Sequence, residues 1–173
     1  WSPALVGVYE LAEKLLSLSR ALSGALIDPL MPAFSNLHAG KDNERAHSLF
    51  VHASKLVAMT GMAALSGLFV FADRIIMAWT GQPEPLAAWT IRIMALGHFI
   101  WIMTGPSSSV LRGRGTLRLE LTNAIVRTVL AAALIVPGVI ARRYDWIVLA
   151  IVVSRIASSL WFLLQFTRQE DHG

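Results

Sequence analysis

Five long stretches of the chain consist mainly of apolar residues, and short polar segments separate them. Each can provide the roughly 20 residues that a helix needs to cross a hydrocarbon core of about 30 Å. The second stretch has no charged residue from Leu56 to Ala72, and the fifth has only Arg155 between Ile147 and Phe166. A soluble helix bundle would need polar faces on these helices. The pattern therefore predicts an all-α integral membrane protein, a single domain of five transmembrane helices at residues 4–34, 56–79, 86–111, 119–141 and 146–166.

Composition excludes several other protein classes. Of the 173 residues, 55% are hydrophobic and 15% are charged, whereas an average soluble domain has about 25% charged residues. Disordered chains are instead poor in apolar residues and rich in charge. The chain has no cysteine, which excludes disulfides, cysteine-bound zinc and thiol nucleophiles. The net charge of +4 comes from basic residues between apolar stretches, which is typical of a membrane protein rather than of a nucleic-acid-binding one.

The basic residues of the loops predict an orientation, because Lys and Arg concentrate on the cytoplasmic side of a membrane protein. Seven lie on one side of the predicted bundle and three on the other: Lys41, Arg45, Lys55, Arg112, Arg114, Arg118 and Arg168 against Arg74, Arg142 and Arg143. The loops after the first and third spans and the C-terminal tail are therefore predicted to be cytoplasmic. The chain begins at Trp1 without an initiator Met, and we interpret it as a piece of a longer protein.

A polar turn at Ala39–Asp42 follows the first span. Asp42 or Asn43 can cap a short helix that runs from Glu44 to about Lys55. Its charged residues predict that this helix lies at the membrane interface and leads into the second span.

Three arginines, Arg20, Arg127 and Arg155, lie near the middle of predicted spans. Facing lipid, they would together cost about 8–10 kcal/mol, so we expect them to face the bundle interior or a wet cavity. Polar residues recur at steps of three and four along the first span, and the fourth and fifth spans have similar stripes. The three stripes are Glu10, Glu13, Lys14, Ser17, Arg20, Gly24 and Asp28; Glu120, Asn123 and Arg127; and Arg155, Ser158 and Ser159. They can line one shared cavity.

Each of these charges also has a purely structural interpretation. Arg20 could pair with Glu13 or Asp28, and Arg127 could bond to Asn123 one turn away. Arg92, near the start of the third span, could extend to the interface, and His98 is expected to pack or hydrogen-bond within the bundle. Arginines in a cavity nevertheless favour a phosphate-bearing substrate, because the guanidinium binds phosphate through two parallel hydrogen bonds.

Proline positions predict interruptions within the spans. Gly105 and Pro106 in the third span are candidates for a hinge, because proline removes a backbone hydrogen bond and broken helices often line transporter binding sites. An ordinary kink, satisfied by the serines that follow, is the alternative. Pro29, Pro32 and Pro137 are expected to kink or end helices.

The signatures of enzymes and metal sites are missing from the sequence. There is no glycine-rich phosphate loop, no Gly-x-Ser-x-Gly and no His-Glu-x-x-His. His47 and His52 are five residues apart, on different faces of a helix, so they do not form a metal-binding pair. No enzyme activity, metal or cofactor is expected.

Several short motifs resemble the polysaccharide-exporter branch of the MOP (MATE-like) exporter superfamily. They are the segments 6–12 (VGVYELA), 29–35 (PLMPAFS), 39–42 (AGKD), 104–106 (TGP) and 110–113 (VLRG). Members of this superfamily typically have about twelve or more membrane helices in two lobes. The resemblance implies that this chain is part of a C-terminal lobe, with the N-terminal lobe of the same protein missing.

The resemblance also implies a function. Such proteins flip undecaprenyl-diphosphate-linked oligosaccharide across the bacterial cytoplasmic membrane by alternating access, for O-antigen, capsule or exopolysaccharide synthesis. The polysaccharide synthesis machinery is then a possible partner. Arg20, Asn123, Arg127 and Arg155 become candidates for binding the lipid-linked oligosaccharide, and Glu13 and Asp28 for binding a coupling ion, although no strict motif of the family fixes these roles.

Three other functions stay open at this point. One is a multidrug or cation antiporter of the same superfamily, for which an acidic cavity would be expected. Another is a membrane-embedded glycan enzyme, which usually needs a large external loop that this chain lacks. The third is a scaffold that transports nothing and anchors a synthesis complex.

Overall fold

The computed structural model describes residues 3–171, and in that range it contains seven helices and no strand. The helices are α1 (Pro3–Ile27), α2 (Leu30–Ala39), α3 (Asn43–Thr80), α4 (Pro85–Ile102), α5 (Gly105–Gly113), α6 (Arg118–Ile140) and α7 (Tyr144–Asp171).

Within residues 3–171, four helical segments are long and apolar enough to cross a membrane, whereas the hydropathy pattern predicted five spans. They are α3, the pair α4–α5 taken together as Pro85–Gly113, α6, and α7 over Tyr144–Gln169. Helix α1 has 25 residues but is not among these four. Its charged residues at Glu10, Glu13, Lys14 and Arg20 explain the difference from the five spans that we expected.

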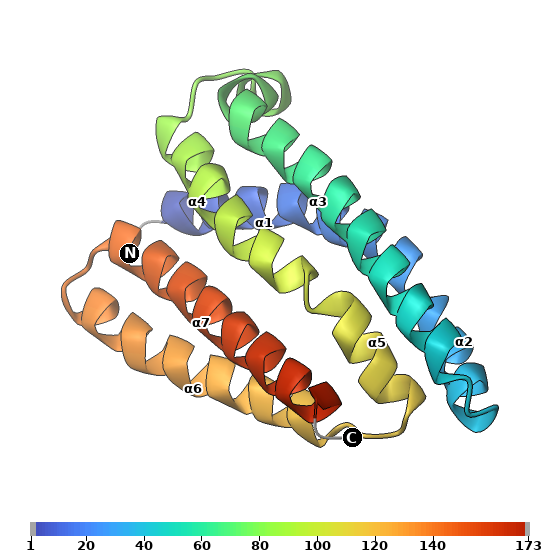
Figure 1. The fold of residues 1–173 in the computed structure, drawn as a ribbon. Helices are drawn as coiled ribbons and strands as arrows, with labels where there is room; N and C mark the ends of the chain where they lie inside the picture. The colour runs from blue at the N-terminus through green and yellow to red at the C-terminus, as the bar shows by residue number, and fades with distance from the viewer. Residues whose placement is uncertain (1–2, 172–173) are drawn as a thin grey trace.

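The helices form an elongated bundle (Figure 1). Helices α6 and α7 form an antiparallel hairpin, α4 packs between α3 and α7, and α1 packs on both α3 and α4. Figure 1 shows that α1 crosses α4 at a steep angle, whereas α2 runs alongside α3. This crossing brings residues near the N-terminus against helices from the second half of the chain.

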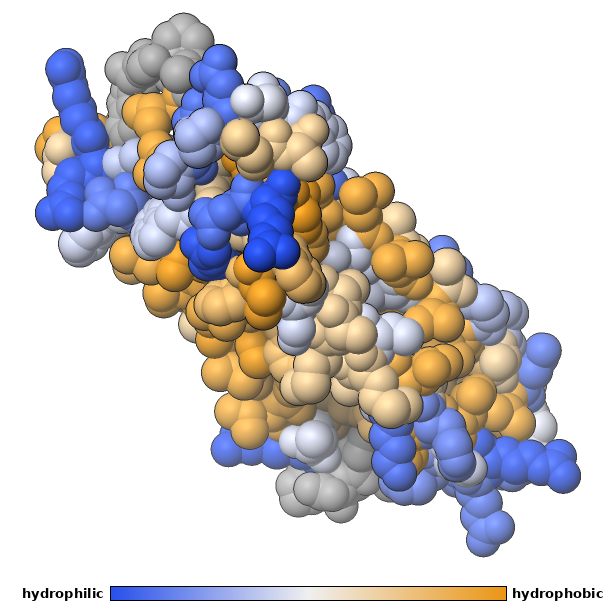
Figure 2. Space-filling view, turned by 90° about the horizontal axis from the view of Figure 1, so that it is seen from above, coloured by the Kyte–Doolittle hydropathy of each residue, from blue (hydrophilic) through white to orange (hydrophobic). Residues whose placement is uncertain are grey.

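The loops lie at the two ends of the bundle in the pairing that the charge pattern predicted. The α2–α3 turn, the α5–α6 loop and the C-terminal end of α7 share one end, at the lower right of Figure 1, and the α3–α4 and α6–α7 loops lie at the opposite end. Figure 2 shows a largely hydrophobic surface between two ends where hydrophilic residues gather. This distribution of hydrophobic and hydrophilic surface residues is typical of a protein that crosses a membrane.

The helix that contains the second predicted span begins earlier than expected, because Glu44–Lys55 is not a separate helix. Helix α3 runs without interruption for 38 residues, which corresponds to about 57 Å at 1.5 Å per residue. The side chain of Asp42 caps its start by accepting a hydrogen bond from the Arg45 backbone N–H at 3.1 Å, as predicted. No glycine or proline occurs between Asn43 and Thr60, so nothing in the sequence ends the helix before the apolar segment.

The first and third expected spans are each divided into two helices. The turn at Asp28 and Pro29 separates α1 from α2, and residues 103–104 separate α4 from α5. Pro29 and Pro106 have no backbone N–H to continue the preceding helix. Near the second break, the Thr104 hydroxyl donates to the Trp101 carbonyl at 2.7 Å, which supplies a partner to a carbonyl near the end of α4.

Buried apolar residues form two clusters, one on each side of the helix breaks. The larger joins α1, α3, α4 and α7 and includes Leu16, Ile76, Ile91, Met94 and Val148. The smaller lies towards the other end and joins α2, α5, α6 and α7 through Phe34, Val110, Leu111, Leu119, Phe162 and Phe166. The two breaks therefore mark the boundary between two separately packed halves.

Candidate functional site

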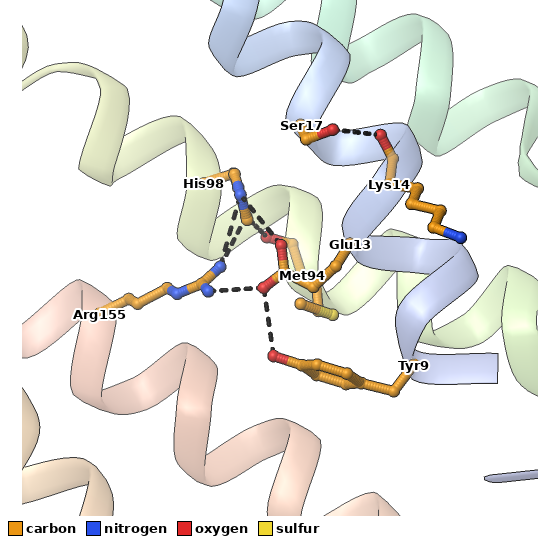
Figure 3. A network of polar contacts seen from close by, with 7 residues as sticks. All are labelled: Tyr9, Glu13, Lys14, Ser17, Met94, His98 and Arg155. Carbon is orange, nitrogen blue, oxygen red and sulfur yellow. Dashed lines mark hydrogen bonds and ion pairs between the residues drawn. The ribbon is translucent and has the colours of Figure 1, made fainter. Parts of the chain in front are cut away.

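A charged network links α1 to α7 inside the bundle (Figure 3). Nη2 of Arg155 donates a hydrogen bond to Oε1 of Glu13 at 2.7 Å, although the two residues are 142 positions apart in the sequence. Their side chains are only 20% and 24% exposed. This ion pair brings together the polar stripes predicted for the first and fifth spans.

Helix α4 adds His98, whose side chain is only 1% exposed. Nη1 of Arg155 lies 2.9 Å from its Nδ1. A guanidinium has only donors, so this hydrogen bond requires Nδ1 to accept and the proton to lie on Nε2. The Nε2–H then faces Oε2 of Glu13 at 4.0 Å. In the other tautomer Nδ1 carries the proton, and it can then donate to the Met94 carbonyl, which is 3.2 Å away.

Tyr9 completes the network one turn before Glu13. Its hydroxyl donates to the same Oε1 at 3.1 Å, so this oxygen accepts from both Tyr9 and Arg155. Figure 3 shows Lys14 pointing away from the group. With neutral Tyr9 and His98, the charges of Glu13 and Arg155 cancel, which lowers the cost of holding both in an apolar bundle.

Small residues let the three helices approach closely enough to form this network. A Cβ on Gly97 would lie 3.3 Å from Cγ1 of Val152, so α4 and α7 are in close contact one residue before His98 and three residues before Arg155. On α1, Ala12 and Leu16 are fully buried on either side of Glu13. The apolar packing around Glu13 therefore fixes its position against α4 and α7.

Arg20 lies near this network but does not pair with an acid. Its guanidinium carbon is 5.8 Å from the centre of the Trp101 ring, and the same ring makes an edge-to-face contact with His98 at 5.7 Å. Arg20 is exposed. Its charge is therefore stabilised by a cation–π contact, and the pairing with Glu13 or Asp28 that we considered is not formed.

The candidate hinge lies where the two helix breaks meet. A Cβ on Gly105 would be only 2.3 Å from Cδ1 of Ile27, the last residue of α1. The hydroxyl of Ser109 also lies 3.5 Å from the Ile27 carbonyl. Pro106 is buried among the first residues of α5. Asp28 lies beside Ile27 in the α1–α2 turn and is exposed.

The stripe of α6 is separate from the charged network. Glu120 is bound by Arg112 of α5, whose Nε donates to its two oxygens at 3.1 and 2.9 Å. Arg127, seven residues further along α6, is partly buried and makes no hydrogen bond or ion pair within residues 3–171. It does not bond to Asn123, the partner that we considered.

Two further polar atoms on α6 and α7 have no partner. Oδ1 of Asn123 and Oγ of Ser159 are buried and make no hydrogen bond within the part of the chain that the structure describes. Helices α6 and α7 pack against each other over their length. Asn123, Arg127 and Ser159 therefore supply unsatisfied donors and acceptors to one helix pair, apart from the neutral Glu13–Arg155 network.

Two chemical properties follow from this arrangement. The network of Glu13, His98 and Arg155 balances its own charges, and Arg127 can bind an anion. No group of three or more His, Asp and Glu side chains within residues 3–171 could hold a metal ion.

The sequence did not indicate the bond between His98 and Arg155. One feature of the sequence could have indicated a polar role for His98: it is the only titratable residue between Arg92 and Arg112.

No protein-family model, curated protein or solved structure matches this chain.

Proposed function

We propose that this chain is one helical lobe of a bacterial cytoplasmic-membrane transporter that moves an anionic lipid-linked oligosaccharide, its lipid carrier attached through a diphosphate. The observation that carries the proposal is the charge that remains after internal pairing. Glu13 and Arg155 neutralise each other, whereas Arg127 has no acidic partner within residues 3–171. A cation without a partner within a membrane span is costly and is therefore expected to serve a function.

Arginine suits a diphosphate cargo for a geometric reason. Its planar guanidinium forms two parallel, charge-assisted hydrogen bonds with phosphate oxygens. Asn123 lies one turn from Arg127 on α6, and its Oδ1 has no partner. This oxygen is buried, so in the proposal an oligosaccharide hydroxyl donates to it only when a movement of α6 exposes it, while the diphosphate binds Arg127.

The two helix breaks, between α1 and α2 and between α4 and α5, form the hinge of the proposed mechanism. Gly105 of α5 packs against Ile27 of α1 at the boundary between the two apolar clusters. In alternating access, interrupted helices can absorb a change of direction near the substrate site. In this proposal α1 crosses the membrane as a fifth span, with Glu13 facing the bundle and its charge compensated by Arg155.

The motif resemblance supports the same class of cargo and implies that an N-terminal lobe completes the cavity. A multidrug exporter of cations is less well supported, because the carboxylate of Glu13 is already held by Arg155 and Tyr9. A scaffold would not need an arginine without a partner in the middle of α6.

The experiment compares two arginines of α6 in cells that express the protein containing this chain. Arg127→Gln should reduce surface polysaccharide strongly, by about tenfold if one charge-assisted hydrogen bond to phosphate is lost, and lipid-linked oligosaccharide should accumulate. Arg118→Gln, at the exposed first residue of the same helix, is the matched control and should have little effect.

Protein levels are measured by immunoblot so that loss of transport is separated from loss of protein. Normal surface polysaccharide in the Arg127→Gln cells, at normal protein level, would contradict the proposal and would favour a scaffold.

A further inference from the structure

An apolar groove of about 540 Å³ lies between α3 and α4 on the opposite side of α4 from Glu13. Its volume lies within the roughly 300–1,000 Å³ typical of small-molecule sites. Apart from Ser66, its walls are apolar, and they include Met62, Phe69, Val70, Leu96, Phe99 and Ile156. Several of these side chains, Met62, Val70 and Leu96 among them, are more than half exposed.

The groove has the depth of one membrane leaflet. On α3 it extends over the nine residues from Met62 to Val70, which span about 12 Å of helix, and half of a hydrocarbon core is about 15 Å. The segment 56–72 of α3 has no charged residue. The groove occupies the part of this segment nearer the α3–α4 loop.

Charged residues lie at the end of the groove nearest that loop. Asp73 and Arg92 are the first charged residues beyond the groove on α3 and α4, and they form an ion pair. Nε of Arg92 donates at 3.2 Å to the carbonyl of Phe69, a residue of the groove wall. This fixes the guanidinium at the rim, where it is 32% exposed.

The rim offers a donor to a phosphate. Nη1 of Arg92 makes no hydrogen bond within residues 3–171, since its Nε and Nη2 make the two bonds of this side chain. Arg74, next to Asp73, lines a second hollow of about 460 Å³ together with Asp73 and Pro83. Glu84 follows Pro83, so the two arginines and two acids at this end of the groove balance, and Nη1 of Arg92 is the donor left for a phosphate oxygen.

We infer that this groove binds one acyl chain of a membrane phospholipid from the leaflet on the side of the α3–α4 loop, with the lipid phosphate held by Arg92. The length and apolar walls of the groove match an acyl chain, and Nη1 of Arg92, which has no partner within residues 3–171, matches the lipid phosphate. The site is separate from the Glu13–Arg155 network and from Arg127, so it does not depend on the proposed transport function.

The first test measures phospholipid that remains bound to the chain after purification in detergent, as organic phosphate per mole of protein. The wild-type chain should retain about one phospholipid. Leu96→Trp fills the groove and Arg92→Gln removes the phosphate ligand. Each should weaken retention by about tenfold, the factor expected for one charge-assisted hydrogen bond or two buried methylene groups. Asp73→Asn should increase retention, because it removes the competing carboxylate.

Val129→Trp is the matched control, since Val129 is 63% exposed on α6 and lies outside the groove. It should retain as much phosphate as the wild type. Equal retention by the wild type, Leu96→Trp and Val129→Trp would overturn the inference. Far-UV circular dichroism shows whether each variant is folded.

A second test needs no variant. A phosphatidylglycerol with a photoreactive acyl chain is incorporated with the wild-type chain into vesicles, irradiated, and the labelled peptides are mapped. Labelling concentrated on Met62, Val70 and Leu96 supports the site. Labelling that is no stronger there than on Leu121, Ile125 and Val129 of α6 would mean that the groove is covered by bulk lipid or by protein, and the inference would fail.

Discussion

Arg127 and Arg155 occupy similar positions in neighbouring helices but have very different surroundings. Both lie near the middle of an apolar span. Arg155 lies between α1 and α4 and bonds to Glu13 and His98, whereas Arg127 is on α6, which packs mainly on α7, and has no partner within residues 3–171. Sequence position alone does not distinguish the two side chains.

The difference predicts separate roles for the two arginines, stability for Arg155 and, in the proposed function, binding for Arg127. Arg155 compensates an acid and connects three helices, so its removal leaves a carboxylate without its ion-pair partner. Arg127 compensates nothing within the described part of the chain. Stability should therefore depend on Arg155, and cargo binding on Arg127.

The largest expected effect comes from breaking the network. Arg155→Ala should reduce the free energy of unfolding by about 2–3 kcal/mol, the lower end of the range for buried pairs because both side chains are about a fifth exposed. Glu13→Ala should cost a similar amount. Removing both charges as Glu13→Leu with Arg155→Met should cost less than the sum, since no unpaired charge is left. Denaturation in detergent micelles measures all three.

The exposed pair Arg143 and Asp145 of the α6–α7 loop is the control, with side chains 63% and 45% exposed. Arg143→Gln should leave the free energy of unfolding close to that of the wild type, because a solvent-exposed ion pair contributes little. Additive losses in the Glu13 and Arg155 variants would show that the two residues do not interact, and the comparison would then fail.

An intermediate effect is expected where α1 meets the α4–α5 break. Gly105→Ala should destabilise by about 1–3 kcal/mol, because the added Cβ would overlap Ile27. Ile27 can relieve part of this overlap through its flexible end. In Gly67→Ala, on α3, the added Cβ meets nothing within 4 Å, so this variant should be neutral or stabilising by up to about 1 kcal/mol. Thermal unfolding in micelles compares the two, and equal midpoints would show that α1 is not tightly packed at the break.

The smallest effect on stability is expected at Arg127. Arg127→Gln should not lower the free energy of unfolding, because it breaks no contact within residues 3–171 and removes an uncompensated charge from a span. The same micelle denaturation is used, with Arg155→Ala as the sensitive reference. A loss as large as that of Arg155→Ala would reveal a structural role for Arg127 and remove the contrast.

Much of the fold follows from local signals in the sequence. The four segments that can cross a membrane, the loops that share an end of the bundle, the Asp42 cap and the interruptions at Pro29 and Pro106 depend on residues close together in the chain. The prediction of a separate helix at Glu44–Lys55 was wrong, because a change from polar to apolar composition does not end a helix without a breaking residue.

The candidate site was less predictable, because its contacts join distant residues. The sequence offered three central arginines and several acids, and nothing local identifies Glu13 as the partner of Arg155. That choice depends on the steep crossing of α1 over α4 (Figure 1) and on the close approach of α4 to α7 at Gly97. The bond between His98 and Arg155 has the same origin.

The most direct test of the account measures whether Arg127 binds a diphosphate. The wild-type chain in lipid nanodiscs is titrated with undecaprenyl diphosphate and with neutral undecaprenol, and the experiment is repeated with Arg127→Gln and Arg118→Gln. The account predicts that the wild type and Arg118→Gln prefer the diphosphate, and that Arg127→Gln weakens its binding by about tenfold or more. Equal affinities for the two lipids in the wild type, or no change in Arg127→Gln, would contradict it.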